Sequence, residues 1–275
     1  MKKMKNKSCT FFHYYNNLRE KSRTQEKVRD KNLFIGIDLG GKEKKSTGIC
    51  ILEEAKGTIA PLENWYQTCQ DVFGKEILRK IASYLKRTKV IAIDASLTGG
   101  RGKGKMRLYE KFLSQKIFRK ARVTPIPPAL MPNFCNFALE LTKKLEKRGL
   151  VLDLNLIEVF PTLINKVCGE NLGSKVLKRK LPCKRGNQKS ALICAILAYL
   201  HSVFKTRYLG YRDGFLFLPE FSFWKSSWQK KFSQAWREKP YLKYRYLITN
   251  LFFSNQTGQK NRPGNRQILP PKKII

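Results

Sequence analysis

The chain has 275 residues, of which 56 are Lys or Arg and 20 are Asp or Glu, so its formal charge at pH 7 is +36. Hydrophobic residues make up 42% of it, which is enough for one sizeable α/β domain with tails. So large a charge predicts a polyanionic partner, first of all nucleic acid, although a generally lysine-rich surface is the alternative. Seven cysteines without a CxxC pair and only two histidines exclude a histidine-rich metal site and disfavour a zinc site or disulfide framework.

The two ends of the chain are basic and show no clear hydrophobic period. We expect residues 1–31 to form a flexible basic arm and residues 229–275 a basic, partly disordered tail, with the folded domain over residues 32–228. No apolar run approaches the roughly 20 residues that cross a bilayer, and the N-terminus lacks the apolar stretch of a signal peptide. These features favour a cytoplasmic protein with no membrane partner.

The first half of the domain alternates strand-like and helical patterns. Three runs predict an antiparallel meander of three strands: residues 33–38 (LFIGID), 47–54 (TGICILEE) and 58–66 (TIAPLENWY). Residues 71–87 carry apolar side chains at helical spacing, with Asp71 at the N-cap position. Residues 89–94 (KVIAID) are continuously apolar at four positions, as in a strand that is buried on both faces.

The second half adds helices and further strands. We expect a Gly-rich basic segment that becomes helical, a helix over residues 128–148, a strand over 152–160, a short helix from Pro161, an apolar helix over 189–204 and a strand over 214–218. A three-strand meander followed by a helical crossover to a parallel strand is the RNase H-like arrangement. The sequence thus predicts an α/β fold, an RNase H-like mixed sheet of an antiparallel meander plus parallel strands, flanked by helices.

Three acidic residues end three separate strand-like runs: Asp38, Asp94 and Glu158. A carboxylate beside Ile or Val is costly to bury unless it is paired or binds a metal. Strands that converge their carboxylates would offer the oxygen ligands that Mg²⁺ or Mn²⁺ requires. The alternative is three unrelated acids that end strands. We therefore expect Asp38, Asp94 and Glu158 to be both metal ligands and catalytic residues.

Seven strings occur in the order of a known family: GIDLGG, TGICIL, IAIDASLT, PPALMP, LIEVFPT, ALICAILAYL and DGFLFLP. Over about residues 33–220 the chain resembles the uncharacterised "domain of unknown function" family of predicted RNase H-like nucleases. The resemblance implies an RNase H-like fold and a metal-dependent nuclease. Asp38 and Asp94 match the aspartates of the family's first two motifs, and Glu158 matches the glutamate of its ExxP motif.

Two positions depart from the family pattern. The family often has an aspartate before the final helix motif, where this chain has Ser190, so one implied metal ligand is missing. The Arg-Asp-rich motif after the second aspartate is kept only in part, as Arg107, Glu110 and Lys111. The departure at Ser190 puts two-metal catalysis in question.

Two basic segments are predicted to flank the acidic cluster and to bind nucleic acid. Their candidate residues are Lys103, Lys105, Arg107, Lys178, Arg179, Lys180, Lys184 and Arg185. Solvated charged loops are the alternative interpretation. Near the C-terminus, aromatic residues that alternate with Lys and Arg suit either the stacking of single strands or an amphipathic helix on the core: Trp224, Trp228, Trp236, Tyr241, Tyr244 and Tyr246.

These features predict a Mg²⁺- or Mn²⁺-dependent nuclease that hydrolyses phosphodiester bonds in DNA or RNA. The first alternative is a catalytically weakened nucleic-acid-binding protein of the same fold. A second alternative is an actin-like or sugar-kinase-like ATP-using domain, in which Gly40, Gly41 and Thr47 would cradle a phosphate. The chain is short for the paired domains of such proteins, and a simple turn between two strands explains these residues as well.

Overall fold

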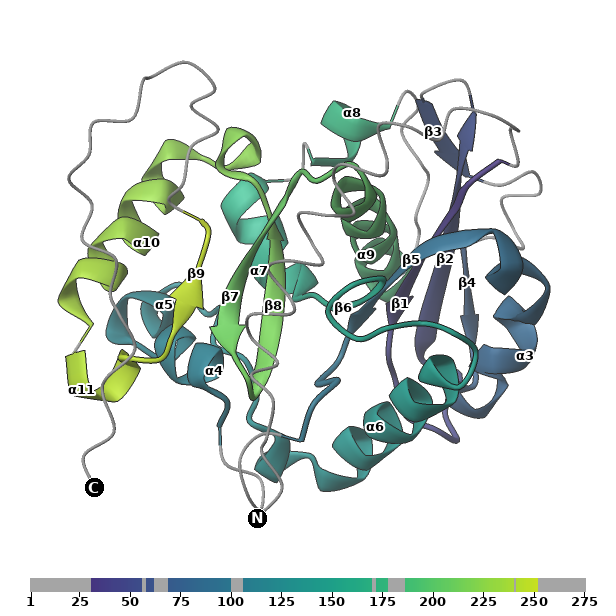
Figure 1. Ribbon diagram of the computed structural model, residues 1–275, viewed down its shortest axis with the longest axis horizontal. Helices are drawn as coiled ribbons and strands as arrows, with labels where there is room; N and C mark the ends of the chain where they lie inside the picture. Colours follow the sequence, from purple (N-terminus) through teal and green to yellow (C-terminus); the bar gives the residue numbers. More distant parts are fainter. Residues whose placement is uncertain are drawn as a thin grey trace, which may run out of the picture.

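The computed structural model describes residues 31–55, 58–61, 69–99, 106–169, 172–177, 186–239 and 241–251. The predicted N-terminal arm up to residue 30 and the tail beyond residue 251 lie outside the described residues. Figure 1 shows two β-sheets side by side, with helices between and around them.

The larger sheet has six strands and is mixed, as the sequence predicts. Its strands are β1 (Leu33–Asp38), β2 (Thr47–Ala55), β3 (Thr58–Pro61), β4 (Cys69–Val72), β5 (Thr88–Asp94) and β6 (Leu156–Glu158). Along the order β3-β2-β1-β5-β6, the β1–β2 and β2–β3 pairs are antiparallel, and the β1–β5 and β5–β6 pairs are parallel. An antiparallel meander followed by parallel strands is therefore present.

β4 lies where the sequence predicts the start of a helix. It pairs antiparallel with the β2 edge, from Thr47 opposite Val72 to Cys50 opposite Cys69, so Asp71 is a strand residue and caps no helix. β3 uses the other half of the same edge. Helical structure begins only at η1 (Gly74–Glu76) and continues through α3 (Ile77–Ile81) and η2 (Ala82–Arg87). Backbone pairing with a free strand edge thus outweighs a weak local helical preference.

The central strands carry side chains into two cores on opposite faces of the sheet. On β1, Phe34 joins the core that contains α9 (Gly186–Ser202), whereas Ile35 and Ile37 join the core under α3 and α6 (Pro132–Glu146). The α6 helix follows η3 (Pro128–Leu130), so the helix expected from residue 128 starts four residues later. Gly149, at a φ of 89°, follows α6 as predicted.

Helix α9 packs on β1 and β2 at two glycines. A Cβ atom added to Gly36 would lie 2.0 Å from the carbonyl oxygen of Ala191, and one added to Gly48 would lie 2.3 Å from that of Asn187. Only glycine permits this close approach of helix backbone to strand backbone. The contact fixes the first turns of α9, and with them Ser190, beside the end of β1.

The second sheet is antiparallel with the order β8-β7-β9, from β7 (Thr206–Tyr211), β8 (Gly214–Pro219) and β9 (Ile248–Thr249). The remaining helices are α4 (Leu108–Leu113), α5 (Lys116–Lys120), α7 (Pro161–Cys168), α8 (Leu172–Val176), η4 (Phe221–Phe223), α10 (Ser226–Glu238) and α11 (Tyr241–Tyr244). The predicted tail boundary at residue 229 falls inside α10, whose Trp228, Phe232 and Ala235 are buried. The start of the predicted tail therefore belongs to the folded body.

Candidate functional site

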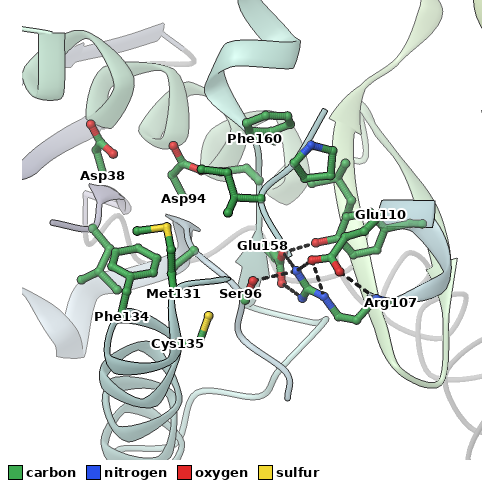
Figure 2. Close-up of a pocket in the computed structure, with 17 residues that line it drawn as sticks. Asp38, Asp94, Ser96, Arg107, Glu110, Met131, Phe134, Cys135, Glu158 and Phe160 are labelled. Atoms are coloured by element: carbon green, nitrogen blue, oxygen red, sulfur yellow. Dashed lines mark hydrogen bonds and ion pairs between the residues drawn. The ribbon is translucent and has the colours of Figure 1, made fainter. Parts of the chain in front are cut away.

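Asp38 and Asp94 lie side by side at the ends of the two central parallel strands, where they are register partners across β1 and β5. Ligands of open α/β sheets bind at the carboxyl ends of such strands. Both side chains line a pocket of about 280 Å³ (Figure 2). The structure therefore brings together two of the three acids that the sequence singles out.

The rest of the pocket has one apolar side and one polar end. The apolar lining includes Ile126, Met131, Phe134 and Phe160. Figure 2 shows Asp38 and Asp94 at one end of the group, and Glu158, Glu110 and Arg107 joined by hydrogen bonds at the other. Carboxylates thus stand at both ends of one cavity.

The acid pair is electrostatically strained. Burial raises the pKa of Asp38 to about 6, the negative charge of Asp71 adds to the rise, and a hydrogen bond from the Ser190 hydroxyl opposes it. Burial also raises the pKa of Asp94 well above its usual value, and the charges of Asp38 and Glu158 raise it further. Two carboxylates in this state favour a shared proton or a cation between them.

Ser190 and Asp71 complete the surroundings of Asp38. Ser190 donates a hydrogen bond from α9 to the Asp38 carboxylate, so position 190 adjoins the acid pair. Gly48 of β2 pairs with Asp38 of β1 on one side and with Asp71 of β4 on the other. The two aspartates therefore lie in one row across the sheet. Asp71 was missed as a site residue because its segment resembles a helix start. The run Cys69–Val72 is too short to identify a strand by itself.

Glu158 is held apart from the acid pair. Its carboxylate accepts hydrogen bonds from the Arg107 guanidinium at 2.6 and 2.7 Å, from the Leu97 amide at 3.0 Å and from the Tyr109 hydroxyl. The register explains this. Glu158 pairs with Ile93 and not with Asp94, so it leaves the sheet on the opposite face from Asp94. The expected convergence of three carboxylates therefore does not extend to Glu158 in this structure.

Arg107 is an interior residue and not part of an exposed basic loop. It is 1% exposed, and it donates to Glu110 at 2.5 and 2.9 Å as well as to Glu158. The prediction that Arg107 contacts nucleic acid is therefore wrong in this structure. The side chain is buried, and its guanidinium is already bonded to Glu110 and Glu158. The other predicted nucleic-acid-binding residues lie outside the described residues: Lys103, Lys105, Lys178, Arg179, Lys180, Lys184 and Arg185.

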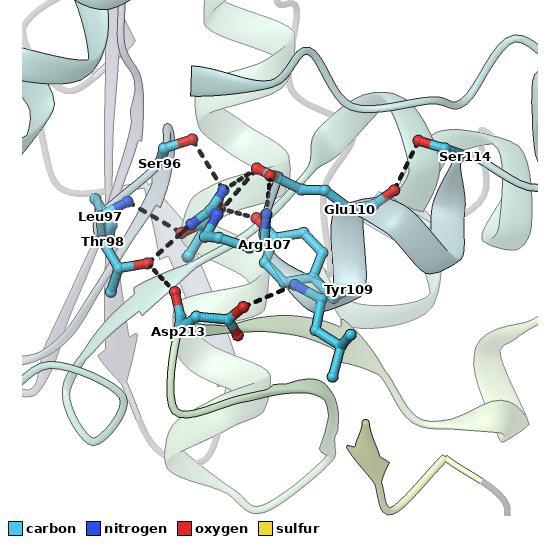
Figure 3. Close-up of polar contacts among 10 residues, drawn as sticks. Ser96, Leu97, Thr98, Arg107, Tyr109, Glu110, Ser114 and Asp213 are labelled. Carbon is cyan, nitrogen blue, oxygen red and sulfur yellow. Dashed lines mark hydrogen bonds and ion pairs between the residues drawn. The ribbon is translucent and has the colours of Figure 1, made fainter. Parts of the chain in front are cut away.

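A hairpin turn closes the Arg107 network from the side of the second sheet (Figure 3). Thr98 donates from its hydroxyl to the Asp213 carbonyl oxygen at 2.7 Å, and the Leu108 amide donates to the Asp213 carboxylate at 2.9 Å. Gly214, at a φ of 137°, lies against Thr98 and Arg107. The string DGFLFLP, which the sequence singles out, thus begins with the residues that fasten β7 and β8 to the site.

The glycine turn of the ATP-using alternative and the buried His201 both have structural roles. The amides of Gly40 and Gly41 donate to the side-chain oxygens of Thr47 and Ser46 at 3.0 and 3.2 Å, so the GGKEKKST segment is an internally bonded turn. His201 is buried, with its ring nitrogens 2.8 Å from the Thr206 hydroxyl and 2.9 Å from the Leu154 carbonyl oxygen. Burial lowers the pKa of His201 to about 4, which suits a neutral structural residue.

Among the described residues, no group of three or more His, Cys, Asp or Glu side chains is arranged to hold a metal ion. The helices in the described part of the chain are too short or too polar to cross a membrane. Comparison with models of protein families, with curated proteins and with solved structures gave no match to this chain.

Proposed function

We propose that this protein is an RNase H-like, divalent-metal-dependent nuclease that hydrolyses phosphodiester bonds in DNA or RNA. The observation that carries the proposal is the Asp38–Asp94 pair, two adjacent carboxylates with raised pKa values at the ends of parallel strands. The formal charge of +36 supports a polyanionic substrate, because so large an excess of Lys and Arg attracts polyanions such as nucleic acids.

The residues fit one Mg²⁺ or Mn²⁺ ion better than two. Mg²⁺ in proteins is often held by one or two carboxylates, with water and substrate phosphate in its other positions. Asp38 and Asp94 would supply these two carboxylates, and a cation there would offset the burial, and the smaller charge repulsion, that raise their pKa values. When bound, the metal would polarise the scissile phosphate and acidify a water molecule. Glu158, with both oxygens on Arg107, is not needed as a ligand in this arrangement.

The neighbouring side chains have supporting roles in the proposal. Ser190 keeps the Asp38 carboxylate oriented through its hydrogen bond, and Asp71 adds negative potential from the same level of the sheet. The Glu158–Arg107–Glu110 ion pairs hold the chain that follows β5 in place. At neutral pH, Asp38 with a pKa of about 6 is mostly ionised and can accept a cation.

A cleavage assay tests the proposal directly. Single-stranded, duplex, hybrid and branched substrates are incubated with Mg²⁺, Mn²⁺ or EDTA, beside Asp38→Asn, Asp94→Asn and the control Glu238→Gln, an exposed acid of α10. We expect metal-dependent cleavage that falls by roughly 10²-fold or more in each aspartate variant, because each removes charge aimed at the reacting groups. Wild-type rates in Asp38→Asn would show that the pair is not catalytic.

A binding protein without nuclease activity is the second candidate, and two observations favour it. Glu158 is engaged by Arg107, and a serine stands at position 190 beside Asp38. Both features leave fewer carboxylates for metal than the family pattern implies. If wild type binds nucleic acid and no divalent metal supports cleavage of any substrate, this second function replaces the first. The ATP-using alternative is disfavoured, because the amides of Gly40 and Gly41 are bonded within their own turn.

A further inference from the structure

The aromatic residues near the C-terminus divide into a buried group and an exposed one. Trp224, Trp228 and Tyr244 belong to the core, and Trp236 packs edge-on against Phe112. Trp228 and Trp236 lie on α10, so for these two the amphipathic-helix interpretation holds. Tyr246 differs, because it is 45% exposed although it lies only two residues from the buried Tyr244.

Tyr246 stacks on a tyrosine from a distant part of the chain. Its ring lies 5.3 Å from that of Tyr211, centroid to centroid, with 25° between the ring planes. The Arg212 guanidinium lies 5.9 Å from the Tyr211 ring centroid, and that of Arg245 lies 4.5 Å from the Tyr246 centroid. We call these four residues the tyrosine–arginine cluster. Both arginines are exposed.

The second sheet assembles the cluster. β9 pairs with β7, with Thr249 opposite Leu209 and Ile248 opposite Gly210, and Figure 1 shows β9 alongside β7. This pairing brings the segment after α11 to the end of β7, where Tyr211 and Arg212 begin the hairpin turn. The cluster is therefore held in place by strand pairing.

The chemistry of the cluster suits one kind of partner. Aromatic rings beside guanidinium groups bind single-stranded nucleic acid, because bases stack on the rings and on guanidinium planes while the charges face phosphate. A duplex hides its base faces within its own stack, so it can use only the charges. The formal charge of +36 adds long-range attraction for a polyanion.

The position of the cluster links it to the pocket. Asp213, the next residue after Arg212, bonds to Thr98 and to the Leu108 amide. Gly214 follows and lies against Arg107, which lines the pocket. The cluster and the polar end of the pocket are thus joined through one four-residue turn.

We propose that the tyrosine–arginine cluster is a binding surface for single-stranded nucleic acid that leads unpaired bases toward the Asp38–Asp94 pocket. The surface deepens the proposed nuclease function by naming its substrate class. Its affinity for single strands does not depend on metal or cleavage, so the two proposals fail separately.

The test measures affinity by fluorescence anisotropy, with the full-length protein in EDTA so that no metal-dependent cleavage occurs. The probes are a labelled oligothymidylate, a labelled duplex and a labelled poly-glutamate peptide. Tyr246→Ala is compared with Tyr246→Phe, which keeps the ring, and with Leu242→Ala, which removes an 81% exposed apolar side chain from the same region. Arg245→Gln is compared with Lys80→Gln, a change at an exposed lysine of α3. Thermal unfolding of each variant checks that the fold is kept.

We expect Tyr246→Ala to weaken oligothymidylate binding by roughly 5- to 150-fold, the range for the loss of one stacked base. Tyr246→Phe, Leu242→Ala and Lys80→Gln should stay within about twofold of wild type, and duplex affinity should change little in Tyr246→Ala. Arg245→Gln should reduce the slope of log K against log salt by about 0.7 for the single strand. Unchanged oligothymidylate affinity in Tyr246→Ala overturns the proposal. So does an equal loss for single strand and duplex, or a selective loss for the acidic peptide, which would identify a protein partner.

Discussion

The two ends of the pocket hold carboxylates in opposite electrostatic states. At one end, Glu158 and Glu110 flank the buried Arg107, and three charges form two ion pairs at 2.5 and 2.6 Å. At the other end, Asp38 and Asp94 form no ion pair with any described residue, and burial raises both pKa values. At the first end, Arg107 balances the charge of the two glutamates. At the second end, the two aspartates lack a positive charge, which a ligand can supply.

A register difference of one residue separates the two ends. Asp38 and Asp94 are direct partners across β1 and β5, but Glu158 pairs with Ile93 across β5 and β6. Since neighbouring residues of a strand face opposite ways, Glu158 points away from the side of the acid pair. An acid at a strand end is therefore a site residue or a structural residue according to the face on which it falls.

The largest expected change in stability comes from removing Arg107 from its two ion pairs. Arg107→Met leaves Glu158 and Glu110 buried without their cation, which should lower the free energy of unfolding by about 3–5 kcal/mol. Arg79→Met is a matched control, because Arg79–Glu76 is also a 2.5 Å pair three residues apart, yet its arginine is 72% exposed and that of Arg107 is 1% exposed. The control should cost about 0–1 kcal/mol.

Urea unfolding in EDTA measures both variants. Equal small losses would mean that water reaches the Arg107 network and that burial does not set its strength. In that case Glu158 would also be accessible to a metal ion, and the contrast between the two ends of the pocket would disappear.

The second expected effect is a pH-dependent gain in stability when the buried carboxyl of Asp38 is removed. A folded-state pKa of about 6 for Asp38, against 3.8 for the ordinary group, means that the folded chain holds a proton that the unfolded chain releases. The wild type therefore loses stability as pH rises from about 4 to 6, and the loss is complete above 6. Asp38→Asn lacks this loss, so it should be more stable by roughly 2–3 kcal/mol at pH 7.5 and by nearly nothing at pH 4.

Unfolding at several pH values in EDTA checks the sign. The control Glu43→Gln should show no such gain, because the hydrogen bond from Lys75 lowers the pKa of the exposed Glu43 carboxyl. Saturating Mg²⁺ should stabilise the wild type and leave Asp38→Asn nearly unaffected, which narrows the difference. A stability gain that is independent of pH would show that desolvation of the ionised Asp38 is not the source of the strain.

Much of the fold could be predicted from the sequence, because its strands are buried and strongly patterned. The runs LFIGID and KVIAID form β1 and β5, and the apolar helix over residues 189–204 is observed as α9. The failures involve weak local signals. β4 is a four-residue strand that exists through its pairing with β2, and β7 (TRYLGY) alternates polar and apolar residues too irregularly to identify without β8 beside it. Pairing partners far apart in the sequence decide such elements.

The site could be predicted only as far as the ends of strands. The sequence placed Asp38, Asp94 and Glu158 at such ends, and the parallel crossover suggested that the first two meet. It carried no information on the β5–β6 register, which sets the face of Glu158. Nor could it show that Arg107, in a segment rich in Gly and Lys, is buried between two glutamates. Charge in a sequence indicates attraction to a polyanion, but burial decides which charges are available.

A third, smaller effect adds to the strain at Asp38. Ser190→Asp replaces a hydrogen-bond donor with a second carboxylate beside Asp38, so the metal-free protein should lose about 1–2 kcal/mol at neutral pH. Mg²⁺ or Mn²⁺ should bind more tightly and restore the loss, because the new oxygen is a hard ligand. Ser190→Asn, which is similar in shape and uncharged, should show neither effect. Thermal shift during metal titration separates the variants, and a metal response of Ser190→Asp equal to that of wild type would place the cation elsewhere.

The smallest effect tests whether the charge of Asp71 reaches Asp38 along the row of residues that also holds Gly48 and Asp94. Asp71 contributes to the raised pKa of Asp38, but less than burial does. Asp71→Asn should therefore lower the Asp38 pKa from about 6 toward 3.8 without reaching it, because burial remains. NMR titration of the Asp38 carboxyl carbon measures the change, with Glu43→Gln as an exposed control. A fall to the ordinary value would mean that repulsion along the sheet, and not burial, dominates the pair. No fall would show that solvent screens Asp71 from the site, and the acidic potential would then come from Asp38 and Asp94 alone.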